Sequence, residues 1–113
     1  MPKYLISFPS AAMAVPADEL AAVGQEAHAV IEAAKAAGVY VFAGGLDASV
    51  PVVRVSASGE VTEGGYPQAR PLDGGFTVLD LPSRDDALAW AARLAAACRC
   101  AQELRVFGLD PQA

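Results

Sequence analysis

Cysteine and histidine are scarce in this chain, which has two cysteines and one histidine in 113 residues. A structural zinc site takes about four Cys or His ligands, and Cys98, Cys100 and His28 together are too few. A disulfide between the two cysteines would be strained, because a single residue separates them. We therefore expect no metal or other cofactor, and two reduced thiols, as in a cytoplasmic protein.

Basic residues and long apolar runs are also in short supply. Eight lysines and arginines stand against thirteen aspartates and glutamates, and the formal net charge is -5. Nucleic-acid binding needs clustered Lys and Arg that replace the counterions of phosphate, and an anionic membrane surface makes a similar demand. No apolar run approaches the roughly 20 residues that cross a bilayer. We therefore expect no nucleic acid and no membrane among the partners.

What the chain does contain is apolar residues, which make up 54% of the sequence. This share predicts a packed fold, and the length allows one domain spanning residues 1–113. The start of the chain is apolar but is broken at Ser7, Pro9 and Ser10. It is too short for the core of a signal peptide, and its alternation is typical of a first strand.

The periodicity of apolar residues predicts four main strands, two helices and an extra hairpin. The first helix is expected to end just before Gly38, which would adopt the left-handed conformation. Ser83 is expected to cap the N-terminus of the second helix. The hairpin is expected to turn at Ala57-Ser58. The strands are expected at 3–8, 39–45, 75–81 and 103–108, the helices at 17–37 and 83–98, and the hairpin strands at 51–56 and 59–63.

This order of elements is a split βαβ arrangement. It predicts an α+β, ferredoxin-like fold, in which an antiparallel sheet carries two helices on one face. The strands are apolar on both sides, and Tyr40 and Phe42 are expected to share a face opposite Val39 and Val41. The face without helices would leave large apolar side chains in water, which normally marks an interface. We therefore expect a homodimer through the sheet face.

Five short motifs follow one another through most of the chain after Gly38: AGGLDAS, GEVTEGGY, GGF, SRDDALAWA and ELRV. In order and spacing they resemble the YCII-related proteins, in the branch named for a D-G-P-F motif, whose place is taken here by Glu63-Gly64-Gly65-Tyr66. The resemblance implies a fold of the dimeric α+β barrel type with a cleft beside the sheet. Relatives include proposed small enzymes and proteins encoded near sigma factors. His28 and Asp47 lie near the places of a histidine and an acidic residue proposed as a catalytic pair.

Two residues are candidates for catalysis. His28 is a candidate general base, because the ordinary pKa of imidazole suits proton transfer at neutral pH. On a helical wheel it lies about 120° from the centre of the apolar stripe, so a solvated surface histidine is the alternative. Asp47 follows a strand, where sites are often found. Its alternative role is that of a turn residue whose carboxylate accepts bonds from nearby backbone N–H groups.

The segment EVTEGGYPQARPLDGGF, residues 60–76, is a long connection with two glycine pairs. Loops of this length without secondary structure are uncommon and are often functional. As a flap it would place Glu63, Tyr66, Arg70 and Asp73 around a ligand, with Tyr66 folded back onto Phe76 and Arg70 facing a carboxylate. As a plain connection it would only need its glycines for tight backbone geometry.

We therefore expect a domain that binds a small organic molecule in a cleft under the loop from Glu63 to Asp73. One alternative is a cofactor-free enzyme that uses acid and base groups in that cleft. The other alternative is a regulatory or protein-interaction module linked to sigma-factor signalling. A buried polar cluster with a shifted carboxylate pKa would favour the enzyme, and outward-facing polar groups would favour the interaction module.

Overall fold

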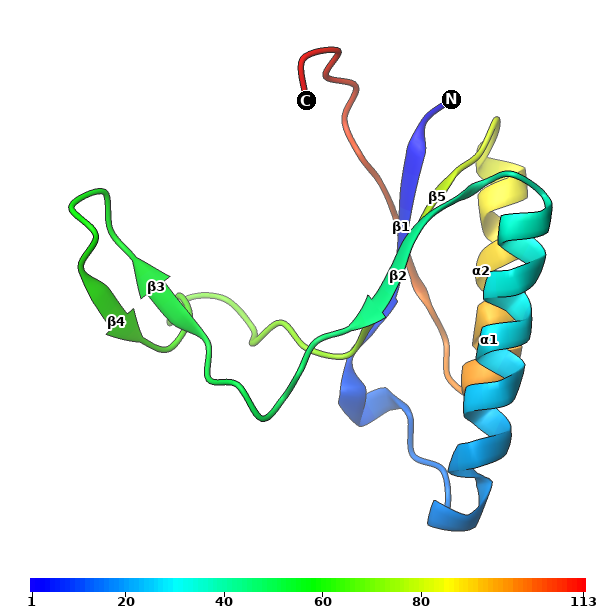
Figure 1. Cartoon of the computed structure of the whole chain (residues 1–113), viewed down its shortest axis with the longest axis horizontal. Helices are drawn as coiled ribbons and strands as arrows, with labels where there is room; N and C mark the ends of the chain where they lie inside the picture. Colours follow the sequence, from blue (N-terminus) through cyan, green and yellow to red (C-terminus); the bar gives the residue numbers. More distant parts are fainter.

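The computed structural model describes residues 1–113 as a mixed α+β fold with two helices and two antiparallel sheets (Figure 1). Both helices cover one face of a four-stranded sheet with the strand order β2-β5-β1-β6. Strands β3 and β4 form a separate hairpin. The coarse prediction of fold class is thus confirmed. The bounds are β1 Lys3–Phe8, α1 Leu20–Ala36, β2 Tyr40–Gly45, β3 Val53–Val55, β4 Val61–Glu63, β5 Gly75–Asp80, α2 Arg84–Cys98 and β6 Glu103–Val106.

Local sequence explains where the helices begin and end. The hydroxyl of Ser83 accepts a hydrogen bond from the backbone N–H of Asp86 at 3.2 Å, which is the predicted cap of α2. Helix α1 begins three residues later than predicted, because Ala17–Glu19 form a 3-10 turn. Gly38 follows its end at a φ of +75°, as expected of a residue beyond a helix C-terminus. Neither helix has the length and apolar character needed to span a bilayer.

The core lies where both helices pack on the centre of the sheet. Strands β1 and β5 contribute Ile6 and Leu79, which are 1% and 0% exposed. Trp90 of α2 packs against this core and is partly buried, and the guanidinium of Arg93 lies over its ring at 4.3 Å from the centroid. The buried core cluster is Tyr4, Ile6, Ala34, Leu79, Leu81, Ala87, Ala91 and Leu94.

Strand β2 contains an irregularity that places Tyr40 and Phe42 on opposite faces, so the prediction of a shared face is wrong. Tyr40 lies opposite Leu79, which faces the helices, whereas Phe42 lies opposite Val78. The register shifts between the two aromatic residues. An extra residue in one strand of a pair reverses the alternation of every residue that follows it. Phe42 is consequently 57% exposed.

The sheet face that points away from the helices is only partly covered by the chain, and we call it the open face. Cross-strand partners share a face, and the register places four apolar side chains on it. The ring of Phe42 also lies over Gly44, 3.0 Å from where a Cβ would stand. The apolar side chains of the open face are Leu5, Phe42, Phe76 and Val78.

The hairpin of β3 and β4 projects from the body on the side opposite the helices (Figure 1), and we call residues 51–64 the arm. The predicted hairpin is confirmed, although its turn has three residues rather than two. The N–H of Ser56 donates to the carbonyl of Glu60 at 2.9 Å, and Gly59 completes the turn at a φ of +86°. Register places Val53, Val55 and Val61 on one face of the arm.

The chain exposes more surface than a single domain of its size normally does. Its accessible area is 7813 Å², whereas a folded monomer of this mass exposes about 5,800 Å². Its radius of gyration is 15.9 Å, against about 13 Å for a compact domain of this length. Only 13 of 113 residues are buried. The arm and the open face are the parts of the fold that stay uncovered.

The second glycine pair of the long loop is required where β5 begins beside the end of β1. Gly74 has a φ of +95°, and a Cβ on it would lie 1.9 Å from the carbonyl oxygen of Phe8. A Cβ on Gly75 would lie 2.7 Å from the ring of Phe8. Only glycine fits at position 74, because the clash there is with backbone, whereas a side chain at position 75 would require the ring of Phe8 to move. Gly65 differs, because a Cβ there would meet nothing and its φ is not positive.

We expect Gly74→Ala to lower the free energy of unfolding by about 2 kcal/mol or more, because the substitution adds both a backbone clash and left-handed strain. Gly65→Ala is the matched control and should stay within about 0.5 kcal/mol of wild type. Urea denaturation followed by circular dichroism measures both. Similar losses in the two variants would contradict this account of the loop.

Candidate functional site

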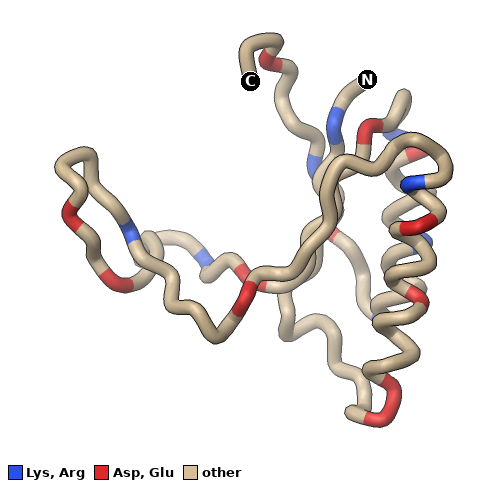
Figure 2. The backbone as a smooth tube through the Cα atoms, viewed as in Figure 1, with Lys and Arg blue, Asp and Glu red and all other residues tan.

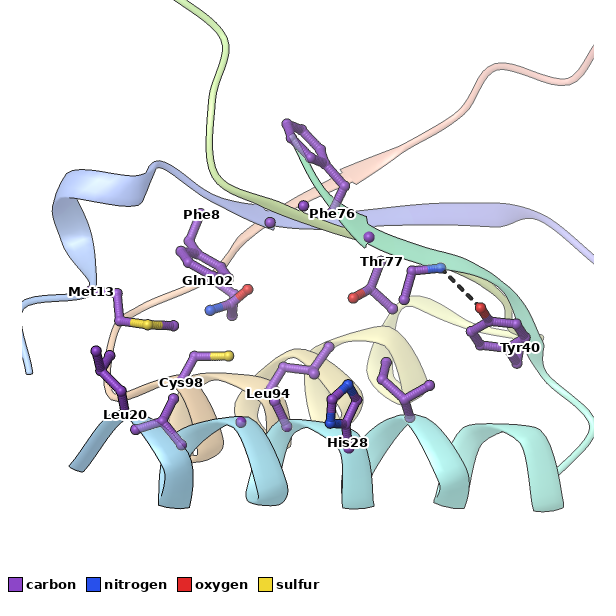
Figure 3. A pocket seen from close by; sticks show the side chains of 18 of the residues that line it. Phe8, Met13, Leu20, His28, Tyr40, Phe76, Thr77, Leu94, Cys98 and Gln102 are labelled. Carbon is purple, nitrogen blue, oxygen red and sulfur yellow. Dashed lines mark hydrogen bonds between the residues drawn. The ribbon is translucent and has the colours of Figure 1, made fainter. Parts of the chain in front are cut away.

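A cavity of about 540 Å³ lies between α1 and the helix-facing side of the sheet. Figure 3 shows α1 along one wall and the strands along the other. Most of the residues that line it are hydrophobic, and they come from β1, α1, β2, β5 and α2. The apolar side chains in its wall include Phe8, Met13, Leu20, Val23, Ile31 and Leu94.

Small residues explain why the chain does not fill this space. On the sheet side, Gly45 lines the cavity without a side chain, whereas a Cβ on Gly44 would meet the ring of Phe42 and one on Gly75 the ring of Phe8. On the helix side, Gly24 lines it too, and a Cβ there would meet nothing within 4 Å. The apolar stripe predicted for α1 is therefore buried only in part, and Leu20 remains 52% exposed.

Polar atoms reach the cavity at a few places on its wall (Figure 3). Thr77 of β5 is 8% exposed and points toward α1, and its hydroxyl forms no hydrogen bond within the chain. The hydroxyl oxygen is not sealed from solvent, so a molecule in the cavity can form the hydrogen bond that the chain does not supply. The hydroxyl of Tyr40 accepts from the N–H of Ala43 at 3.2 Å, so its own proton stays free. Gln102 adds an amide.

His28 lies at the rim of the same cavity. It is exposed to solvent, as expected from its place on the helical wheel, yet its imidazole projects from α1 toward the sheet (Figure 3). Cys98 lies in the wall, where burial, and to a lesser extent the neighbouring Cys100, raises the pKa of its thiol. A thiol with a raised pKa stays protonated at neutral pH and is not an activated nucleophile.

Asp47 does not line the cavity and is engaged in its own turn. Its carboxylate accepts hydrogen bonds from the hydroxyl of Ser49 at 2.6 Å and from the Ser49 N–H at 2.9 Å. The hydroxyl bond and then the backbone bond lower the pKa of Asp47. These bonds correspond to the turn role that the sequence offered as the alternative to catalysis.

Asp73 and Arg70 lie on the other side of the sheet. Both line a second pocket of about 510 Å³ on the open face, together with Arg105 of β6. The Asp73 carboxylate accepts hydrogen bonds from the hydroxyl of Ser10 at 2.5 Å and from its N–H at 3.1 Å. These bonds lower the pKa of Asp73 and attach the long loop to the 3-10 turn Ser10–Ala12.

Glu63 and Tyr66 stand further out. Glu63 is the last residue of β4 in the arm, and Tyr66 is 73% exposed and lines neither cavity. The ring of Tyr66 therefore does not fold back over a cleft, as the flap hypothesis expected. The structure separates the six candidates, with His28 at the helix-side cavity, Arg70 and Asp73 at the open face, and the other three in neither.

Sequence reasoning missed Thr77 and Gly24 as cavity residues, although both left a signal. Thr77 is a polar residue at a position of β5 whose alternation partner, Leu79, is fully buried. A polar residue at a core-facing position needs either a partner or a site. Gly24 stands inside a helix, where glycine lowers stability relative to alanine unless the fold needs the space.

Comparison with known proteins assigns no family. No protein-family model matches the chain, and no curated protein matches it either.

We expect Asp73 to stabilise the folded chain above pH 3.8, its ordinary pKa, and to lose this contribution as the pH falls further. The sign follows because the folded-state pKa lies below the unfolded-state value. Asp73→Asn should therefore lower stability at neutral pH and flatten its decline in acid. Urea denaturation across this pH range measures the effect. Glu60→Gln, at an exposed position whose carboxylate forms no hydrogen bond, is the control and should follow the wild-type curve.

Proposed function

We propose that this protein binds a small, mostly apolar organic molecule in the cavity between α1 and the sheet. The observation that carries the proposal is the Thr77 hydroxyl, which is held in an apolar wall without a partner from the chain. Ligand sites combine an apolar lining with a few placed polar groups, and their volumes are about 300–1,000 Å³. At about 540 Å³ the cavity falls within this range.

The lining favours an uncharged ligand that carries a hydrogen-bonding oxygen or nitrogen. Lys35 is the single lysine or arginine in the wall. It already pairs with Glu32 at 3.2 Å and lies over the ring of Tyr40 at 5.1 Å. An anionic ligand would find no free cation there. Arg70, which the sequence suggested for a carboxylate, lies at the open face instead.

A cofactor-free enzyme is the second candidate, and the observation that favours it is His28 at the rim of the same cavity. An imidazole beside a bound molecule can accept or return a proton. This alternative requires turnover that His28→Gln abolishes while ligand affinity stays unchanged. Unchanged turnover in His28→Gln would rule out catalysis by His28, and ligand binding would then be the only function proposed for the cavity.

We also propose that the fold is ferredoxin-like and that the chain is a relative of the YCII-related proteins. The strand order β2-β5-β1-β6, with both helices on one face, supports the first statement. The motifs from AGGLDAS to ELRV support the second. A regulatory role linked to sigma factors belongs with this family proposal. Figure 2 shows basic and acidic residues interspersed along the chain rather than gathered by sign.

The open face supports one further proposal, a homodimer through the sheet. The chain exposes roughly 2,000 Å² more than is expected of a monomer of its mass. This excess surface is available for burial in an interface. Obligate dimers bury about 2,000–5,000 Å² in total over both partners. Phe42, at 57% exposure, is the largest uncovered side chain of this face.

Ligand binding is tested by the fluorescence of Nile red, a neutral dye that reports an apolar environment. Gly24→Phe should fill the cavity and weaken dye affinity at least about tenfold, which is the order expected for loss of an apolar site. Ala29→Phe, on the solvent face of α1, is the matched control and should bind like wild type. Equal affinity in both variants would place the dye outside the cavity and overturn the proposed site.

In a thermal-shift screen of uncharged compounds, hits should lose affinity in Thr77→Val.

The dimer is tested by light scattering over a range of concentrations. Wild type should give about twice the monomer mass at micromolar concentration, because the open face is then buried. Phe42→Asp should shift the equilibrium toward monomer. A wild-type mass that stays monomeric throughout would refute the dimer without bearing on the cavity.

A further inference from the structure

The arm has an apolar surface that the rest of its chain leaves uncovered. Val53, Val55 and Val61 share one face and are 45%, 64% and 61% exposed, and Glu63, opposite Val53, stands at the end of this face. An isolated two-stranded hairpin is only marginally stable in water. Valine side chains stabilise a fold only when they are removed from water. The arm therefore needs a surface to pack on, and its own body does not provide one.

The open face is such a surface, and the dimensions of the arm match it. Four strands spaced about 4.8 Å apart span about 15–19 Å. The six residues 51–56, extended at about 3.3 Å each, reach about 20 Å. Figure 1 shows the arm leaving the body on the side of the sheet away from the helices. An arm of this length crosses the whole open face of a second copy.

We propose that the chain forms an arm-exchanged dimer, in which the valine face of each arm packs on the open face of the other copy, over Phe42 and Val78. The inference rests on the proposed homodimer and adds the part that the arm plays in it. Two-fold symmetry makes the contact reciprocal, so both arms and both open faces are buried together. A second copy is the occupant that covers both unpartnered surfaces of this chain at once.

The arm contact is tested by Val55→Asp, with Thr62→Asp as the matched control. Both substitutions add one carboxylate to a three-residue strand of the arm, but Thr62 lies on the other face, opposite Arg54. Val55→Asp should raise the dimer dissociation constant at least about tenfold, because a carboxylate is costly to bury in an apolar contact. Thr62→Asp should stay close to wild type. Sedimentation velocity measures all three proteins, and circular dichroism verifies that each is folded.

Mixing two defective chains distinguishes an exchanged arm from a contact between sheets alone. Val55→Asp has a damaged arm and an intact open face, whereas Phe42→Asp has the reverse. Each should be mainly monomeric by itself. An equimolar mixture should form a heterodimer, because the intact arm of one chain meets the intact face of the other.

The outcomes separate this inference from the homodimer on which it rests. Wild-type affinity in Val55→Asp overturns the role of the arm and leaves the dimer through the sheet face standing. A mixture that stays monomeric also overturns arm exchange. Wild type that is monomeric at every concentration overturns both, and the arm then belongs to a contact with a different protein.

Discussion

The antiparallel pairing of β1 with β5 is the interaction on which the rest of the structure depends. The pairing runs from Lys3 opposite Asp80 to Phe8 opposite Gly75, and β2 and β6 each add to one side of it. It directs Ile6 and Leu79 toward the helices, where they are almost completely buried. All the packing of α1 and α2 on the sheet builds on this central pair. The pairing can continue to Phe8 opposite Gly75 because two glycines stand where β5 meets the end of β1.

The same pairing decides where the cavity lies. At one end of the central strands, large side chains meet the helices and form the core. At the other end the sheet presents Gly45, and α1 presents Gly24, where a Cβ would meet nothing. Interiors are normally filled at close to crystal density, so a space of this size between packed elements reflects missing side chains. We propose it as a site because the hydroxyl of Thr77, a mostly buried residue of its wall, forms no hydrogen bond within the chain and stays accessible from the cavity.

The sequence predicted the elements and their order well, because periodicity reports which side of an element is buried. It failed where one residue changed the register. The irregularity between Tyr40 and Phe42 has no signal in a run of apolar residues, and it moved Phe42 to the open face. The candidate residues are not gathered in one place, for a different reason. Asp47 and Asp73 are polar residues in loops, but Asp47 accepts hydrogen bonds from Ser49 in its own turn, and Asp73 accepts them from Ser10, which is distant in the sequence. The cavity is defined by side chains that are absent, and composition alone does not reveal where they face one another.

Strand β5 connects the two surfaces on which the proposals rest. Its alternation sends Thr77 to the cavity, and Phe76 and Val78 to the open face. A ligand on one side and a second copy on the other would therefore contact neighbouring residues of one strand. Anything that binds the folded chain and not the unfolded chain stabilises it by mass action. The chain buries only 13 residues by itself, so both a ligand and a second copy would add substantially to its stability. Because the two contacts would hold the same strand in place, each would favour the arrangement that the other requires.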